Sequence, residues 1–513
     1  MCKDDFEHHA TSDRNASLST NDYAILQRLG KQPRLNRSFG FMSILGISCT
    51  ALCSWESILL TSVPTLLIDG AAGVVWGLVV NWIGILSVYV ALAELASMAP
   101  TAGGQCKKRL TSTSYSILTK FDLLDYWVAM LAPTSLGKQL RRRLGISLPH
   151  FATLLQGIVV LAHPSYEPQA WQTVLLIWAT SLLCVLMNSI SSRVLAKFEG
   201  LILVLHLVGF FGVLIPLVYL APHNSASDVF TTFQNNGNWP SQGLALLVGF
   251  PTMASSLLGA DCAVHMSEEI QSAPVVVPRA LIYTILINGT LAFAVIIALL
   301  FCATDLEAAV AAADTLYHPS LKIFQSALNS TVGAVVLGSV ILVLSIAASV
   351  GIYASASRMI WSFSRDKGLP FHQFTVQLSK NSLPVNAIFV TYAITILLSL
   401  IVLGSAVALQ ALLSLVNAAL FTSYTLVCGL LLWRRCTGAG PWKLPELLGI
   451  ANNVLGCLHS IFTLFWSFWP QINHPTPSTA NWSVLVFGVL VLSSISWYFI
   501  RAKQHFHGPI KEI

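Results

Sequence analysis

Residues 249–269 read GFPTMASSLLGADCAVHMSEE. This apolar stretch is interrupted by Gly259, Ala260 and Asp261 before it resumes. Unwound backbone inside a membrane is tolerated only where it lines a cavity or packs against protein, and an ionisable residue there indicates a functional site by default. A helix broken near the middle of the membrane is typical of a secondary transporter's substrate site. The alternative is a kinked structural helix in which Asp261 bonds to a neighbour.

The composition is that of a membrane protein. Of the 513 residues, 55% are hydrophobic and only 10% are charged. Apolar runs near the ~20 residues that cross a bilayer recur along the chain, which excludes a soluble globular domain. The ten cysteines form no C-x-x-C pair, and no nucleophile–base spacing, metal-ligand spacing or basic–aromatic stretch is visible. We therefore expect no enzymatic activity, no cofactor, no metal and no nucleic-acid partner.

Twelve candidate spans follow one another with short connections. We expect an all-α polytopic membrane protein with an N-terminal tail at residues 1–40, a transmembrane domain at 41–500 and a C-terminal tail at 501–513. The predicted spans are 41–67, 71–99, 144–161, 171–190, 200–220, 243–265, 280–303, 332–363, 385–403, 406–433, 444–469 and 482–500.

The basic residues predict the orientation. With both termini cytoplasmic and the weak third span counted, 27 of the 28 Lys and Arg residues fall on the cytoplasmic side, and Lys322 is the exception. Cytoplasmic loops of membrane proteins carry such an excess. Omitting the third span would invert every later loop, so twelve spans are favoured.

The first span carries small and hydroxyl-bearing residues where a second break is expected. A half-helix that begins at a break directs unpaired N–H groups and a positive dipole end at its surroundings, which suits a carboxylate. The alternative is that small residues only allow close helix packing. Breaks in both the first and the sixth span favour a substrate site. This predicted site comprises Gly46, Ser48, Cys49, Thr50, Gly259, Ala260 and Asp261.

Other ionisable residues lie inside or at the ends of spans. Glu56 has two possible roles, which the sequence leaves open. It is an acid that takes up protons or faces a cation, or it only pairs with a buried donor. His206, in the middle of the fifth span, either relays protons or hydrogen-bonds a neighbouring helix as a neutral imidazole. Solvated or gating ion pairs are expected at the cytoplasmic ends for Glu268, Glu269, Arg358, Arg365 and Lys367.

Four stretches together resemble one family. They are FGFMSILG at 39–46, AELASMAPTAGGQ at 93–105, GADCAVHMSEEI at 259–270 and ASRMIWSFSRDKGLP at 356–370. In this order they resemble the amino acid/choline transporter branch of the amino acid–polyamine–organocation superfamily, which includes fungal GABA and choline permeases.

The resemblance implies a five-plus-five inverted repeat (LeuT-like) with two extra helices and a midplane site between broken helices 1 and 6. It also implies transport of an amino acid or a related amine such as GABA or choline. Proton-coupled members carry a lysine in helix 5, and aligning KFEGLILVLH at 197–206 places His206 at that position. His206 thereby becomes the preferred proton-coupling residue, with Glu56 as a second candidate.

The chain departs from the family pattern in two places. Residues 106–125 form an insert without a helical apolar face, which we interpret as a retained intron or a gene-model error. The third helix, at 134–161, is abnormal because it is short and carries Arg141, Arg142, Arg143 and Pro149 where an apolar helix should line the site.

We therefore expect a proton-coupled importer of an amino acid or amine that works by alternating access. The alternative is a non-transporting nutrient sensor, or an inactive product with a damaged third helix. The expected partners are the small-molecule substrate, H+ and the lipid bilayer, and the oligomeric state stays open. We expect a multi-pass protein of the plasma membrane, with the vacuolar membrane as the alternative.

Overall fold

A computed structural model of the chain describes residues 26–27, 31–102, 145–367, 369, 371–404, 406–434, 440–477, 479–497 and 499–500. Within these residues the regular secondary structure is helical, apart from an isolated parallel bridge between Phe39 and Ile270. The predicted insert (106–125), the first part of the abnormal third helix (134–144) and the C-terminal tail (501–513) lie outside the described residues.

The described first half of the chain forms two broken helices, 1 and 6, and between them helices 2 to 5. Its helices are α3 (Phe41–Leu52), α4 (Ser54–Met98), α8 (Gly145–Ala162), α9 (Ala170–Ile190), α10 (Ser192–Leu220), α11 (Ala226–Thr231), α12 (Gln242–Ser255) and α13 (Cys262–His265). The helix α4 contains a sharp bend at Gly70 (φ 77°), where a side chain would collide with the backbone of Thr232 and Gln234. Only glycine fits this bend, which separates the end of helix 1 from helix 2.

The second half continues with long apolar helices joined by short ones. These are α14 (Ala273–Cys302), α15 (Leu306–Ala311), α16 (Ala313–Leu316), α17 (Pro319–Leu328), α18 (Thr331–Arg365), α19 (His372–Thr375), α20 (Val385–Ser399), α21 (Ile401–Gly404), α22 (Ala406–Arg434), α23 (Glu446–Trp466) and α24 (Ser483–Trp497).

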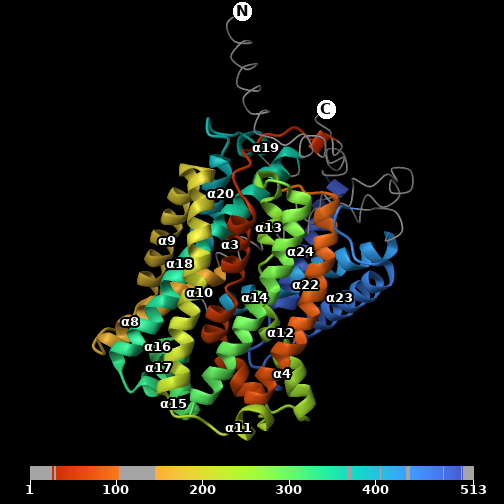
Figure 1. The fold of residues 1–513 in the computed structure, drawn as a ribbon. Helices are drawn as coiled ribbons and strands as arrows, with labels where there is room; N and C mark the ends of the chain where they lie inside the picture. Colours follow the sequence, from red (N-terminus) through yellow and green to blue (C-terminus); the bar gives the residue numbers. More distant parts are fainter. Residues whose placement is uncertain are drawn as a thin grey trace, which may run out of the picture.

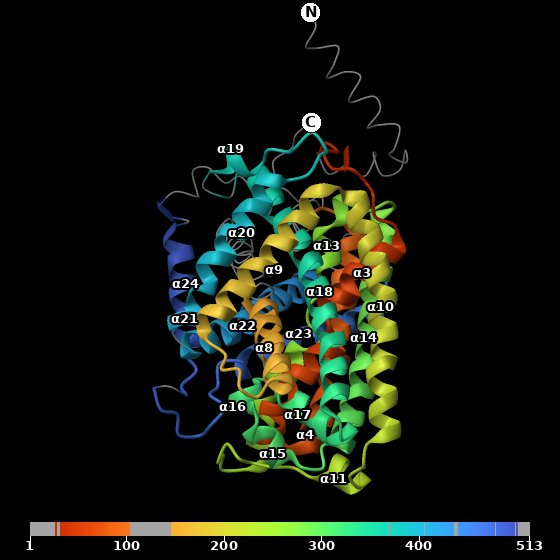
Figure 2. The same cartoon turned by 90° about the vertical axis from the view of Figure 1, so that its left-hand side faces the viewer.

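The long helices stand side by side in one bundle, with α19 at one end and α11 and α15 at the other (Figure 1). We call these the gate end and the far end. Nine helices in the described residues are long and apolar enough to cross a membrane, which confirms the all-α polytopic prediction. The other three predicted spans correspond to α8, to the pair α12 and α13, and to α24. On one side of the bundle, α8 and α9 pack against α18 (Figure 2).

The predicted break in helix 6 is confirmed. The helix α12 ends at Ser255, residues 256–261 are not helical, and α13 resumes at Cys262. Gly259 has a φ of 146°, and a Cβ there would lie 2.6 Å from the carbonyl oxygen of Ala51. Because only glycine tolerates both the conformation and the close approach, Gly259 fixes the break against the end of α3.

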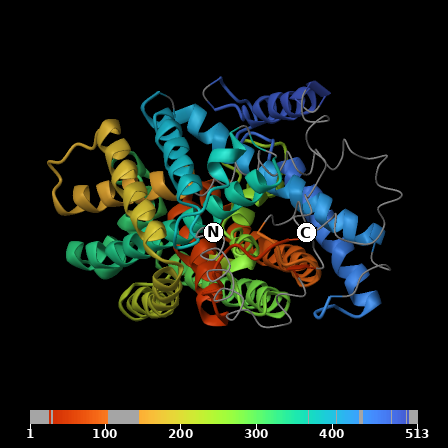
Figure 3. The ribbon, with the colours of Figure 1, turned by 90° about the horizontal axis from the view of Figure 1, so that it is seen from above.

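The break in helix 1 occurs later than predicted. Gly46, Ser48, Cys49 and Thr50 all lie within the continuous helix α3, and the break falls at Cys53, which adopts a left-handed conformation (φ 48°). A Cβ on Gly46 would lie 2.3 Å from the carbonyl oxygen of Glu199 in α10. The predicted position was therefore wrong, because the small residues serve close helix packing instead. Viewed from the gate end, α3 lies in the middle of the bundle (Figure 3).

Candidate substrate and coupling site

The two broken helices meet through backbone and hydroxyl groups. The hydroxyl of Ser48 donates a hydrogen bond to the carbonyl oxygen of Ala260 (2.9 Å), and Gly259 packs on the end of α3. Asp261 is buried at the N-terminus of α13. The structure therefore brings Ser48, Gly259, Ala260 and Asp261 into one region between helices 1 and 6.

The other predicted residues of helix 1 face different helices. The Cys49 thiol lies 3.6 Å from the hydroxyl of Thr284 in α14. The Thr50 hydroxyl bonds to the Gly46 carbonyl (2.8 Å) and lies 3.3 Å from a carboxylate oxygen of Glu199. Gly46, Cys49 and Thr50 therefore hold α3 to its neighbours.

Tyr89, in the second arm of α4, caps the break in helix 6. Its buried hydroxyl accepts hydrogen bonds from the backbone N–H groups of Gly259 (2.9 Å) and Ala260 (3.3 Å), and it donates to the carbonyl of Leu257 (3.3 Å). Sequence reasoning missed this residue, because a tyrosine in an apolar span gives no polar signal. The N–H groups that the sequence assigned to a substrate carboxylate are thus bound by the protein itself.

We expect Tyr89→Phe to destabilise the protein by about 1–3 kcal/mol, since two buried N–H groups lose their acceptor. Thermal unfolding in detergent measures this, and Tyr219→Phe, at a side chain that is 85% exposed on α10, is the matched control. Equal melting temperatures for the two variants would show that the hydroxyl does not stabilise the break.

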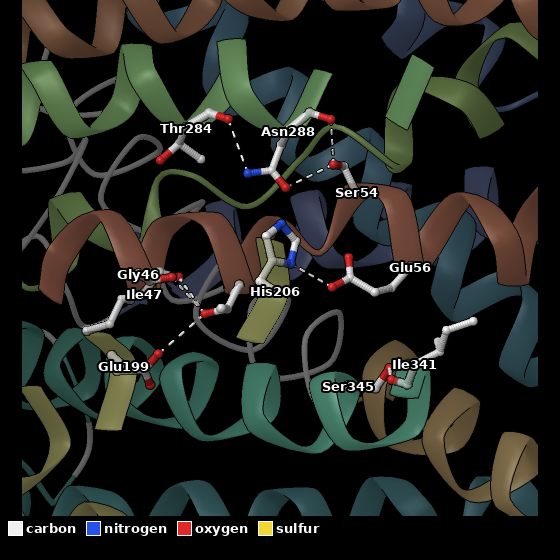
Figure 4. Close-up of polar contacts among 11 residues, drawn as sticks. Gly46, Ile47, Ser54, Glu56, Glu199, His206, Thr284, Asn288, Ile341 and Ser345 are labelled. Atoms are coloured by element: carbon white, nitrogen blue, oxygen red, sulfur yellow. Dashed lines mark hydrogen bonds and ion pairs between the residues drawn. The ribbon is translucent and has the colours of Figure 1, made fainter. Parts of the chain in front are cut away.

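Glu56 and His206 form a buried pair that joins helices 1 and 5. Their Oε1 and Nδ1 atoms lie 2.7 Å apart, and the side chains are 1% and 0% exposed (Figure 4). The other polar atoms of the pair, Glu56 Oε2 and His206 Nε2, have no hydrogen-bond partner in the described part of the chain. Glu56 lies in the first turn after the break in helix 1. The positive end of that half-helix therefore favours a carboxylate that belongs to the protein.

A second buried carboxylate, that of Glu199, lies on α10. Sequence reasoning missed it because the fifth span was predicted to begin one residue later. One oxygen faces Thr50, and the other lies against Gly351 of α18, where an added Cβ would meet it at 3.0 Å. The latter oxygen, Oε1, has no hydrogen-bond partner within the described residues. Glu199 thus lies where α3, α10 and α18 meet.

The gate end is closed by buried ion pairs. The Arg358 guanidinium contacts Glu269 at 2.8 Å, and Arg365 donates two hydrogen bonds to Glu268 (2.9 and 2.7 Å). All four side chains are buried, and Arg365 also stacks on Trp361 at 4.6 Å. Burial contradicts the solvated role for these four residues, and the two pairs join the end of helix 6 to α18.

Further contacts tie the segment before helix 1 to this closure. Phe39 donates its N–H to the carbonyl of Glu269 and accepts from the N–H of Gln271, both at 3.1 Å. Lys31 forms a buried ion pair with Asp366 at 2.8 Å. The start of helix 1, the end of helix 6 and the end of α18 are therefore bonded together at the gate end.

A histidine helps to close the bundle on the other side of the site. His318, directly before α17, is buried and lies 3.0 Å from the hydroxyl of Thr153 in α8, and its ring centre is 5.6 Å from that of His150. Burial, with a smaller contribution from His150, lowers the pKa of His318 from 6.5 to about 3. The connection before α17 therefore packs against the third helix only with a neutral imidazole.

A lowered pKa means that this contact stabilises the protein above pH ~6.5 and that the contribution is lost as the pH falls from there towards ~3. We expect His318→Gln to show a smaller loss of melting temperature than the unmodified protein when detergent solutions are acidified within that window. The exposed His474→Gln variant serves as the control. An unchanged acid sensitivity in His318→Gln would contradict the assignment.

Comparisons with known proteins agree with this architecture. The amino acid permease family matches residues 39–491. A choline transporter of Saccharomyces cerevisiae is 28% identical over 92% of this chain and 83% of its own length. Two proteins of Schizosaccharomyces pombe, each named an uncharacterized amino-acid permease, are 25% and 26% identical over 98% of this chain and 91% and 92% of their own lengths. The chain therefore belongs to the amino acid permease family, and it is a multi-pass membrane transporter of small molecules rather than an enzyme.

Proposed function

We propose that the protein is a proton-coupled importer of a small amine or amino acid that works by alternating access. The buried contact between Glu56 and His206 carries this proposal, because it joins an acid in the first turn after the break in helix 1 to a histidine of helix 5. Ionisable groups inside a membrane are costly and are retained at ion and proton pathways.

The pair couples protonation to movement. A proton that arrives at Glu56 Oε2 or His206 Nε2, the two atoms without a hydrogen-bond partner in the described residues, changes the net charge of a buried site. A charge in such surroundings is costly unless it is paired. The pair joins helix 1 to helix 5, so its change of charge favours a different arrangement of these two helices.

The gate end faces the cytoplasm in this proposal, as the distribution of Lys and Arg favours. The ion pairs of Arg358 with Glu269 and of Arg365 with Glu268 close the cytoplasmic path. Release of substrate requires these pairs to separate. Both termini are then cytoplasmic, and the plasma membrane is the proposed location.

An amine without a carboxylate is the substrate that the site supports best. The helix ends that the sequence assigned to a substrate carboxylate are occupied by the protein: Tyr89 binds the N–H groups of helix 6, and Glu56 lies at the start of the second half of helix 1. A relative is named a choline transporter. Choline is therefore the first substrate to test.

The test is uptake of labelled choline, GABA and a mixed amino-acid panel into transporter-deficient cells at two external pH values. A variant without residues 106–125 is measured beside the chain as written. Acid-stimulated uptake of choline by either form supports the proposal, and uptake only by the shortened form identifies the insert as inhibitory. Binding without uptake by both forms would overturn the proposal in favour of a nutrient sensor. Uptake that does not depend on pH would contradict proton coupling.

A further inference from the structure

An apolar cavity of about 540 Å³ opens between α18, α19 and α20 near the gate end. It is separate from the region between helices 1 and 6. The residues that line it are Ile360, Leu369, Phe371, Phe374, Thr375, Val390 and Ile394.

The lining offers a ligand apolar contacts and little else. Its one hydroxyl group, on Thr375, lies 2.6 Å from the hydroxyl of Ser364 and is thus already hydrogen-bonded. A polar molecule that entered would lose its hydrogen bonds to water without replacement, which is costly. The occupant is therefore a hydrocarbon group.

Exposed apolar side chains adjoin the cavity. Phe371 and Phe374, two of its lining residues, are 85% and 52% exposed. On α20, one of the nine apolar helices, the neighbouring Phe389 and Leu397 are 53% and 66% exposed and extend the apolar surface along the helix. In a membrane, such a surface is covered by acyl chains, so a lipid reaches the cavity without crossing water.

The connections that flank α19 carry basic residues. Lys367 and Lys380 are exposed on either side of it, and the nearby Asp366 is already paired with Lys31. Basic residues beside a membrane attract anionic headgroups, with about 1 kcal/mol for each Lys or Arg near the surface. The charge beside the cavity thus selects an anionic lipid.

We propose that this cavity binds one acyl chain of an anionic phospholipid from the leaflet at the gate end. The acyl chain lies between α18 and α20, and the headgroup lies near Lys367 and Lys380. The bound lipid also stabilises the gate. Trp361, next to the lining residue Ile360, donates a hydrogen bond to the carbonyl of Val376 (3.0 Å), so the cavity wall holds the part of α18 that carries both gating arginines.

The experiment uses the full chain reconstituted in phosphatidylcholine vesicles that contain phosphatidylserine with a photoactivatable acyl chain. Labelled peptides are identified by mass spectrometry. Ile394→Trp fills the cavity, and Leu397→Trp, on the lipid-facing side of the same helix, is the matched control. We expect labelling of the lining peptides to fall about tenfold in Ile394→Trp, the factor that the lost burial of two methylene groups gives, and to stay unchanged in the control.

A second experiment separates the contribution of the lipid headgroup from that of the acyl chain. Replacing Lys367 and Lys380 by Gln is expected to reduce labelling by phosphatidylserine towards that by a phosphatidylcholine probe, without filling the cavity. If Ile394→Trp does not fold, retention of phosphatidylserine by the detergent-purified original protein in native mass spectrometry, and its loss in the lysine variant, decides the question. Labelling spread evenly over the lipid-facing helices, competition by a sterol alone, or cross-links to a second protein copy would each overturn the proposal.

Discussion

Replacing Glu56 by Gln is expected to abolish accumulation of the substrate against its gradient while leaving downhill movement measurable. Gln keeps the size of the side chain and a hydrogen-bonding oxygen for His206, but it cannot take up a proton. A pH difference of about two units supplies about 2.7 kcal/mol per proton, which corresponds to about 100-fold accumulation. In Glu56→Gln this ratio falls to about one, as measured with labelled substrate in proteoliposomes with an imposed pH gradient.

His206→Gln is expected to give the same loss, and the double variant no further loss, since residues that act as a unit are not additive. Ser345→Ala serves as the control. Ser345 lies on the neighbouring helix α18, and in the described residues its hydroxyl donates a hydrogen bond to the carbonyl of Ile341 in that same helix (2.8 Å) (Figure 4). If Glu56→Gln still accumulates substrate in response to pH, the pair is structural, and proton coupling must be sought at Glu199.

Arg358→Ala is expected to have the largest effect on stability, about 3–5 kcal/mol, because it leaves the buried Glu269 carboxylate without its partner. Arg358 is fully buried and also donates to Asn188 (3.2 Å), so its removal affects α9, α18 and the end of helix 6 together. We expect a lower melting temperature in detergent and loss of uptake, since the gate no longer closes.

The companion variant Arg358→Ala with Glu269→Gln tests the cause. Removing the unpaired charge should recover part of the lost stability, whereas a purely packing role for Arg358 predicts no recovery. The exposed Arg193→Ala should stay within about 0.5 kcal/mol of the unmodified protein, as surface substitutions usually do. A single Arg358→Ala variant that unfolds like Arg193→Ala would rule out the buried ion pair.

Much of the fold could be predicted from the sequence because membrane helices reveal themselves by length and hydropathy. The bend at Gly70 separates the first two predicted spans, and Gly259 marks the break in helix 6, because glycine next to an ionisable residue is unusual in an apolar span. The break at Cys53 gave no such signal. A cysteine seldom adopts a left-handed conformation, so the residue type does not mark the break.

The site was predictable only at the level of residue types. Glu56 and His206 stand out as ionisable residues in apolar spans, but their contact depends on the rotation of helices 1 and 5, which one sequence does not give. The pairing of Glu268 and Glu269 with arginines that lie 97 and 89 positions further along the chain is non-local in the same way. Tyr89 and Glu199 were missed because their roles arise from close helix approach.

The bridge between Phe39 and Ile270 bears on cooperativity. Because Phe39 is hydrogen-bonded to the residues on both sides of Ile270, the segments of helices 1 and 6 at the gate end are joined to each other. Glu268 and Glu269 directly precede that bridge in the chain, so any swing of the joined segments withdraws both carboxylates from both arginines in the same step. In the proposed transport cycle we therefore expect all-or-none opening, and a population of molecules should show two discrete separations across the gate end rather than a continuous spread.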